Sequence, residues 1–261
     1  MQAEIGIIGG TGLYDPKLLK NVEEITLSTP YGVPSDAITV GELSGRRVAF
    51  LPRHGKKHTI RPTDVNSRAN IFALKKLGVQ RILAPSAVGS LKEELKPGDL
   101  VFVDQFIDRT TRREQSFYTE KQVCHISVAE PMCPEIRQTL IAVAKDTSIR
   151  AHNTGTYVCI EGPRFSTKAE SRMFRSWGAD IVGMTVVPEC VLAREAEICY
   201  ASIATVTDYD VLKDHPVCMD EIVATLRANI ENVKRIIVEA VARVPKERGC
   251  ECGSALKSAF I

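Results

Sequence analysis

The sequence predicts a single α/β domain whose central β-sheet is mixed, largely parallel and flanked by helices. Short apolar segments alternate with amphipathic segments along the chain, which is the pattern of an α/β protein. Several apolar segments run directly into glycine-rich or polar motifs, as strands do at the ligand-binding edge of an α/β sheet. Because no repeat and no Gly/Ser-rich linker divides the chain, we assign residues 1–244 to one domain and residues 245–261 to a polar C-terminal tail.

Apolar runs bounded by turn residues predict the strands. They cover residues 4–8, 37–43, 46–51, 81–84, 100–103, 156–160, 181–183 and 202–206. We expect residues 86–90, which follow the fourth of these strands, to form a loop. Residues 104–131 carry many charges and few structural signals, so we expect a long functional loop or an excursion from the sheet there.

Capping residues and apolar periodicity predict the helices. We expect them from residue 63 or 64 to 77, over 134–145, from 166 or 167 to 178, from 188 onward, and near the C-terminus. The last helix has the clearest pattern, because one apolar stripe recurs at spacings of three and four residues: Ile222, Leu226, Ile230, Val233, Ile237 and Val241. We expect most of this stripe to pack in the core.

The composition excludes several classes of protein. Of the 261 residues, 44% are hydrophobic and 25% are charged, which excludes a disordered or fibrous chain. No run of about 18 apolar residues occurs, so we expect no membrane-spanning helix. A net charge of +2 gives no electrostatic footprint for nucleic acid. The first residues lack the pattern of a signal peptide, so we expect a cytoplasmic protein.

The eight cysteines are scattered along the chain and form no Cys-x-x-Cys motif. We therefore expect no metal site. Cytosolic disulfides are rare outside hyperthermophiles, yet the pair Cys250-Glu251-Cys252 is unusually close in sequence.

Three motifs at predicted strand ends are candidates for binding an anion. In Gly9-Gly10-Thr11-Gly12, the glycines let backbone N–H groups approach a phosphate. Asp15 stands where a dinucleotide-binding fingerprint requires glycine, and the Gly-Lys-Ser/Thr ending of a P-loop is absent. This motif therefore indicates either a phosphate loop or an ordinary tight turn.

The second motif is Arg53-His54-Gly55, and the third is Ser86-Ala87 with the residues up to 90. Arg53 offers a fork of N–H donors to phosphate oxygens, and His54 adds a donor that depends on its protonation. The hydroxyl and backbone N–H groups of the third motif suit another side of the same anion. The alternatives are two surface residues on a loop for the second motif and an ordinary polar turn for the third.

A fourth motif carries two carboxylates. Asp208 and Asp210, on either side of Tyr209, follow a predicted strand and can meet one face of a ligand. A protonated carboxyl can donate to a leaving group, and an ionised one can accept from an amino group. The alternative is a solvated turn, which is common for aspartate.

Together, six motifs in order resemble the trimeric purine nucleoside phosphorylase family. They are Ile8-Gly9-Gly10-Thr11-Gly12, Arg53-His54-Gly55 with His58-Thr59-Ile60, Asp104-Gln105-Phe106-Ile107-Asp108-Arg109-Thr110, Ile160-Glu161-Gly162-Pro163-Arg164-Phe165-Ser166, Met184-Thr185-Val186-Val187-Pro188-Glu189 and Thr207-Asp208-Tyr209-Asp210. The similarity covers about residues 5–241 and is greatest to members that act on 5′-methylthioadenosine. It implies the fold of that family.

The resemblance implies a phosphorolysis. Inorganic phosphate attacks the anomeric carbon of a nucleoside, the purine leaves, and a ribose 1-phosphate forms with inversion. For 5′-methylthioadenosine the products are adenine and 5-methylthioribose 1-phosphate. The partners implied are a small nucleoside and phosphate, and no metal or organic cofactor is implied.

The resemblance also implies roles for individual residues. The phosphate-binding set is Thr11, Arg53, His54, Ser86, Ala87 and Thr185, and the substrate-binding set is Phe165, Ser166, Met184, Asp208, Tyr209, Asp210, Met219, Ile222, Val223 and His125. Asp208 is the catalytic residue beside purine N7, and Asp210 receives the exocyclic amino group. Aspartate at position 208, where 6-oxopurine enzymes carry asparagine, favours a 6-aminopurine.

The 5′ end and the assembly are implied in the same way. Met219, Ile222 and Val223 match the apolar wall around the methylthio group, although Met219 stands where the family carries valine. His125 matches a residue that reaches the neighbouring subunit's site, which implies a homotrimer or a hexamer of two trimers. The tail resembles that of archaeal thermophile members with paired cysteines, so we expect Cys250 and Cys252 to form or exchange a disulfide.

Three other functions are compatible with part of the sequence. A purine nucleoside phosphorylase for adenosine, inosine or 5′-methylthioinosine would use the same motifs. An NAD-dependent oxidoreductase would use the opening glycine loop, but Asp15 argues against it. A nucleoside-binding module without catalysis would not need the residues expected to bind phosphate.

Overall fold

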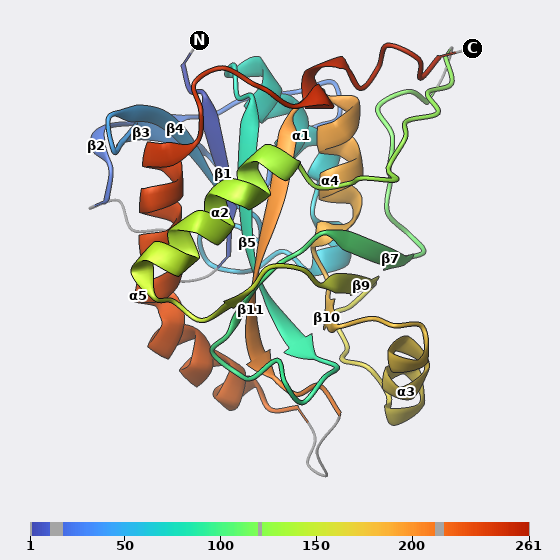
Figure 1. Ribbon diagram of the computed structural model, residues 1–261. Coiled ribbons are helices and arrows are strands. Elements are labelled where there is room, and N and C mark those ends of the chain that lie inside the picture. The colour runs from blue at the N-terminus through green and yellow to red at the C-terminus, as the bar shows by residue number, and fades with distance from the viewer. Residues whose placement is uncertain (1, 11–17, 120–121, 212–216, 261) are drawn as a thin grey trace.

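The computed structural model describes residues 2–10, 18–119, 122–211 and 217–260 (Figure 1). Its described strands form one eleven-stranded mixed sheet, in which parallel pairings outnumber antiparallel ones. The strands are β1 (Ile5–Gly9), β2 (Lys20–Ile25), β3 (Ile38–Leu43), β4 (Arg46–Pro52), β5 (Arg81–Ser90), β6 (Leu100–Phe102), β7 (Gln105–Arg109), β8 (Ala151–His152), β9 (Thr156–Ile160), β10 (Ile181–Gly183) and β11 (Cys199–Asp208). This confirms the predicted α/β class.

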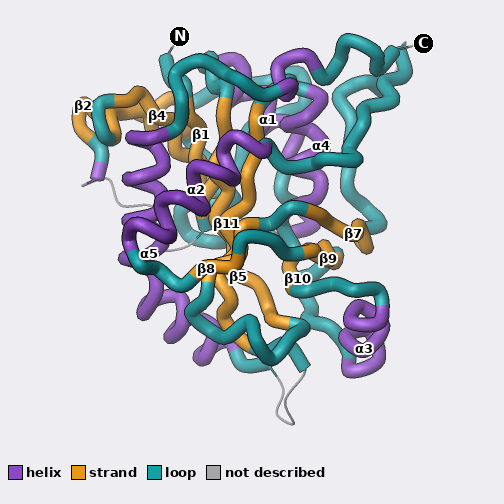
Figure 2. The backbone as a smooth tube through the Cα atoms, in the orientation of Figure 1, coloured by secondary structure: helices purple, strands orange, loops and turns teal. Residues whose placement is uncertain are grey.

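Helices cover both faces of the sheet. The helices are α1 (Ser67–Lys76), α2 (Pro134–Thr147), α3 (Lys168–Ser176), α4 (Val186–Glu195) and α5 (Met219–Arg243), with short 3-10 turns at Pro62–Asp64 and Glu251–Ser254. Helices α1 and α4 pack on one face, and α2 and α5 pack on the other (Figures 1 and 2). In β1, Ile8 faces the α1/α4 core whereas Ile5 and Ile7 face the α2/α5 core, as strand alternation requires.

The central strand β5 differs from its prediction. Residues 86–90 belong to this strand and do not form a loop. The reason is long-range pairing, since β11 runs parallel to β5 from Arg81 to Gly89 and β10 pairs with its last two residues, Gly89 and Ser90. The ends of β5, β10 and β11 therefore meet around Gly89.

Helix ends follow local capping chemistry. Helix α1 begins at Ser67, after Asn66 caps the N–H of Ala69, so the expected start at residue 63 or 64 is wrong. Thr63 instead donates to Glu161, and Asp64 pairs with Arg61. By contrast, Thr167 and Glu170 complete a capping box at α3, as predicted.

Three strands were not predicted from the sequence, namely β2, β7 and β8. Strand β2 lies at the sheet edge with almost every side chain exposed, so it carries no apolar alternation. Strand β7 lies within the predicted loop 104–131 and pairs with β9. The rest of that loop, seen in Figure 2 between β7 and α2, reaches the C-terminal segment, where Cys124 pairs with Phe260.

The C-terminal segment packs against the domain. Cys252 and Ala259 are buried, and the guanidinium of Arg81 donates to the carbonyls of Lys246 and Glu247. Among the described residues, no helix is long and apolar enough to cross a membrane.

Candidate active site

The candidate site lies where the carboxyl ends of parallel strands gather. Asp208 at the end of β11 lies opposite Gly89 of β5, and Val182 of β10 pairs with the same glycine. A Cβ atom on Gly89 would lie 3.0 Å from Oδ2 of Asp208 and 3.2 Å from Cβ of Asp210. Glycine at position 89 thus lets both aspartates approach the sheet, at the edge where α/β proteins bind ligands.

We call Arg53, His54, Ser86, Ala87 and Thr185 the expected phosphate side. Arg53 is its buried cationic residue. Arg53 follows β4 and is 2% exposed. Its Nε and Nη2 donate to the carboxylate of Glu189, which is also buried. Burial opposes the charge on Arg53, but the Glu189 carboxylate outweighs that effect and raises the pKa of Arg53. The guanidinium is therefore a permanently charged, internally paired group.

The rest of the Arg53 fork binds the sheet. Nη1 donates to the carbonyl of Pro85 at 3.0 Å, and Nη2 donates to the carbonyl of Ile8 at 3.1 Å. Of the five N–H bonds of an arginine, one at Nη1 has no partner among the described residues. The structure thus differs from the expected open fork, because Arg53 can offer a single N–H without breaking its contact with Glu189.

His54 is neutral and has a defined tautomer. Burial first, and the Arg53 charge second, lower the pKa of His54 to about 4. Its Nδ1 lies 2.9 Å from the carbonyl oxygen of Ile60, which can only accept, so Nδ1 carries the proton. Nε2 is therefore left as an acceptor.

Ser86 and Ala87, which are neighbours on β5, differ in exposure. The hydroxyl oxygen of Ser86 is buried and has no hydrogen-bond partner in the described structure. Ala87 is exposed, although the other residues of β5 are buried. The Ser86 hydroxyl is therefore a candidate for a ligand contact. Thr11, the remaining member of the expected phosphate set, lies outside the described residues.

Thr185 is held by a buried tyrosine. The backbone N–H of Thr185 donates to the hydroxyl of Tyr157 at 3.2 Å, and the two hydroxyl oxygens lie 3.3 Å apart. A Cβ atom on Gly183 would collide with the Tyr157 hydroxyl, at 2.0 Å, so glycine is required there. Thr185 stands at the start of α4, the helix that also carries Glu189.

The expected purine side consists of Asp208, Asp210, Ser166 and Phe165. In Asp208, Oδ1 accepts from the Thr207 hydroxyl at 2.7 Å and Oδ2 accepts from the backbone N–H of Asp210 at 2.9 Å. Burial raises the pKa of Asp208, and the nearby Glu221 carboxylate adds to this. A carboxyl with a raised pKa is suited to hold and deliver a proton.

Asp210 is more deeply buried and less well satisfied. Burial raises the pKa of Asp210, and its Oδ2 has no hydrogen-bond partner among the described residues. The hydroxyls of Ser166 and Ser171 lie close enough to lower this pKa in part, but neither completes a hydrogen bond. Four of the seven buried side-chain polar atoms without a partner in the described structure thus belong to this site: those of Ser86, Ser166, Ser171 and Asp210.

Arg113, which our sequence analysis missed, holds the wall that carries Met184. Its Nη1 donates to the carbonyls of Met184 and Val187, and its Nε pairs with Glu161. Met184 in turn packs on Gly162, where a Cβ atom would lie 2.5 Å from the sulfur. The sequence places Arg113 and Glu189 in or near a motif but does not indicate their roles. Their ion-pair partners lie more than 40 residues away, and a single sequence does not predict such contacts.

The apolar residues expected at the 5′ end lie at the start of α5. Ile222 is buried, whereas Met219 and Val223 are exposed. Their helix turn is near Asp208, since Glu221 raises the pKa of that aspartate. Phe165 is also exposed, and Tyr209 is half-buried between the two aspartates.

His125 is the member of the expected set that the fold places elsewhere. It is exposed, and its backbone N–H donates to the carbonyl of Ala259 in the C-terminal segment. A pocket of about 230 Å³ is lined by Glu161, Gly162, Glu170 and Phe174, and by none of the expected residues, although Gly162 packs against Met184.

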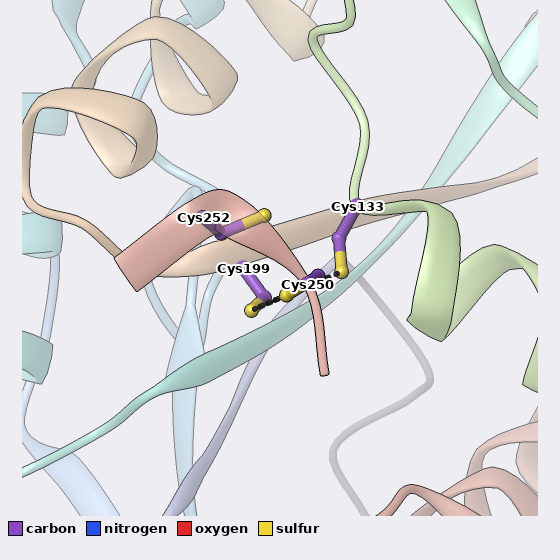
Figure 3. A group of neighbouring side chains, drawn as sticks. All are labelled: Cys133, Cys199, Cys250 and Cys252. Carbon is purple, nitrogen blue, oxygen red and sulfur yellow. Dashed lines mark hydrogen bonds between the residues drawn. The ribbon is translucent and has the colours of Figure 1, made fainter. Parts of the chain in front are cut away.

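The expected disulfide between Cys250 and Cys252 is absent, and all eight cysteines are free thiols. The Cys250 sulfur lies 3.3 Å from the sulfur of Cys199 and 3.7 Å from that of Cys133, and it is not bonded to Cys252 (Figure 3). A tight Cys-x-Cys ring is thereby avoided.

Known proteins resemble this chain over its whole length. The model of the phosphorylase superfamily matches residues 4–242. S-methyl-5′-thioadenosine phosphorylase of Nitrosopumilus maritimus is 58% identical, covering 98% of this chain and 97% of that protein. Among solved structures, methylthioadenosine phosphorylase from an antarctic soil metagenomic library is 46% identical, with a TM-score of 0.94 over 100% of this chain and 93% of that one. The Schistosoma mansoni enzyme in complex with adenine is 43% identical, with a TM-score of 0.92 over 98% and 96% of the two chains.

Proposed function

The chain belongs to the phosphorylase superfamily, and from that premise we propose that it cleaves 5′-methylthioadenosine with inorganic phosphate. The products are adenine and 5-methylthioribose 1-phosphate, so the enzyme is a pentosyltransferase of purine and methionine salvage. One structural observation supports this assignment independently of family membership. Buried polar atoms without partners flank the end of β5 on two sides, at Ser86 and at Asp210 with Ser166. A ligand with an anionic part and a hydrogen-bonding base would satisfy both sets.

On the phosphate side, we assign phosphate binding to Thr11, Arg53, His54, Ser86, Ala87 and Thr185. The unassigned Nη1 proton of Arg53 and the Ser86 hydroxyl are donors to phosphate oxygens, and the backbone N–H of Ala87 is a third. Because Nε2 of neutral His54 accepts, it suits the P–OH of monohydrogen phosphate. The bound phosphate supplies the nucleophile, and its charge favours the cation-like ribose.

On the purine side, Asp208 acts at N7 of the leaving base. Its raised pKa favours the protonated carboxyl, which neutralises the negative charge that develops on the purine as the glycosidic bond breaks. Asp210 accepts from the 6-amino group, which fills its unpartnered Oδ2. A 6-oxopurine would leave that acceptor unsatisfied, at a cost of about 1–3 kcal/mol. Phe165, Ser166 and Tyr209 complete the base-binding wall.

At the ribose, Met184 packs against the sugar, and Met219, Ile222 and Val223 line the methylthio group. Met219 is 56% exposed and Val223 37% exposed in the single chain, so this wall is open without a partner. We propose that His125 of the partner subunit closes it, in a homotrimer or a hexamer of two trimers. This also accounts for the exposure of His125.

The remaining proposals concern context. Residues 1–244 are the catalytic domain and residues 245–261 are its C-terminal segment. The reaction needs no cofactor, because phosphate is a substrate, and neither nucleic acid nor a membrane is a partner. We place the protein in the cytoplasm, where thiols are kept reduced.

Steady-state kinetics on four nucleosides, each with and without phosphate, test the proposed substrate. We expect kcat/KM to be highest for 5′-methylthioadenosine, followed by adenosine, with 5′-methylthioinosine and inosine lower by roughly five- to a hundredfold. Preference for inosine would replace the assignment with a 6-oxopurine nucleoside phosphorylase. Equal adenine release without phosphate would indicate a hydrolase.

A further inference from the structure

The opposite end of β11 holds a cluster of four sulfurs that the proposed reaction does not use. Cys199 begins β11, Cys133 precedes α2, and Cys250 and Cys252 come from the C-terminal segment. All four Sγ atoms lie within 4.8 Å of one another (Figure 3). In the described part of the chain, no other group of three or more cysteine, histidine or acidic side chains converges in this way.

We propose that these four cysteines bind a structural Zn²⁺ ion as a tetrathiolate. In a tetrahedral zinc site with Zn–S bonds of 2.3 Å, neighbouring sulfurs lie about 3.8 Å apart. The separations of 3.3 Å and 3.7 Å from Cys250, and of at most 4.8 Å within the group, lie on either side of that spacing and exceed the 2.05 Å of a disulfide. Four soft sulfur donors select zinc over hard cations.

Two positive groups lie beside the cluster. Cys133 is the N-cap of α2 and lies at the positive end of the helix dipole. Nη1 of Arg194 donates to the sulfur of Cys252 at 3.7 Å. A zinc tetrathiolate has a net charge of −2, so both contacts offset charge in a buried position.

The four sulfurs are already gathered before any ion binds, since they lie within 4.8 Å of one another. Binding of Zn²⁺ releases the remaining thiol protons to solvent and forms four Zn–S bonds without any redox change.

The sequence hides this site because its ligands come from three distant segments. A zinc ion there would fasten the C-terminal segment to α2 and to the start of β11, whose other end carries Asp208. It would act on stability, not on the reaction.

Titration of reduced, metal-free full-length protein with Co²⁺ and then Zn²⁺ tests the proposal. We expect one ion per chain, the visible absorption bands of a tetrahedral cobalt tetrathiolate, and a Kd for Zn²⁺ below about 1 µM that weakens as pH falls. Cys252→Ser and, independently, Cys133→Ser should lose the cobalt bands. The matched control Cys218→Ser, at an exposed cysteine outside the cluster, should keep them.

Two results would overturn the proposal. One is a reduced protein that binds no cobalt or binds zinc with a Kd above about 1 µM. The other is tight binding that persists in both cluster variants, which would place the ion elsewhere. If the protein is isolated with disulfide bonds, it is first reduced and then titrated in the same way.

Discussion

On the phosphate side of the candidate site, the Arg53 guanidinium is already bound by Glu189 and two carbonyls, whereas on the purine side Oδ2 of Asp210 has no partner in the described structure. The cationic group of the phosphate side is therefore already held in place before a ligand binds, although the Ser86 hydroxyl on that side has no partner in the described structure. The purine side instead carries an unsatisfied acceptor that a base with an N–H donor completes. Affinity for phosphate should depend on the Arg53–Glu189 ion pair, and selectivity for the base should depend on Asp208 and Asp210.

The purine side gives the largest expected effect. Asp208→Asn removes a proton donor, so kcat/KM for 5′-methylthioadenosine should fall by about 10²–10⁴-fold. The relative preference for 6-oxopurines should rise, because the asparagine amide can donate to a carbonyl. Steady-state kinetics with adenosine and inosine measure both effects. An unchanged preference would refute the role of Asp208, and Asp220→Asn, on the exposed first turn of α5, is the control.

The phosphate side is tested through the buried ion pair. Glu189→Gln leaves the Arg53 charge uncompensated, so the free energy of unfolding should fall by about 3–5 kcal/mol. Phosphate should restore part of this loss and stabilise the variant more than the wild type. Urea unfolding with and without phosphate measures this, with Glu231→Gln, a 79% exposed member of a surface pair, as the control. Equal losses in the two variants would contradict the account.

The pH dependence of stability distinguishes His54 from the aspartates. The pKa of His54 is lowered from 6.5 to about 4, so the unfolded chain binds more protons between these values. His54 therefore contributes to the free energy of unfolding above pH 6.5. This contribution, at most about 3 kcal/mol, is lost as pH falls toward 4. The raised pKa values of Asp208 and Asp210 act in the opposite direction.

Urea unfolding of wild type and His54→Asn between pH 7 and 4, in phosphate-free buffer, isolates this contribution. The difference between their free energies of unfolding should shrink as pH falls. A difference that is constant over this range would show that His54 titrates normally.

The smallest expected effect is at Ser166. Ser166→Ala removes a buried hydroxyl without a partner, so the ligand-free protein should be as stable as the wild type or slightly more stable. Adenine binding should weaken by about 0.5–1.5 kcal/mol, measured by calorimetric titration. Unchanged adenine affinity would remove Ser166 from the base-binding wall.

The same contrast shows what one sequence can reveal. Arg53, Ser86 and Asp208 were predicted because each stands in a short motif after a predicted strand. The fold places Arg53 and Asp208 against β5, the strand that contains Ser86. The partner of Arg53 was not foreseen, because Glu189 lies 136 residues away and only the fold pairs them. Strand β5 was predicted too short for the same reason, since its second half is defined by pairing with β10 and β11.

The cysteines show the same limit at the other end of β11. Local spacing excluded a Cys-x-x-Cys site and directed attention to a Cys250–Cys252 bond. The fold instead gathers these two residues with Cys133 and Cys199, which lie 66 residues apart in the chain. Contacts of this kind depend on tertiary packing and leave no periodic signal.

The most direct test of the central claim is the balance of phosphate and adenine during turnover of 5′-methylthioadenosine. Adenine release, followed by absorbance, and phosphate uptake, followed by ³¹P NMR, should proceed in a one-to-one ratio with appearance of a sugar 1-phosphate. Adenine release without matching phosphate uptake would contradict the account.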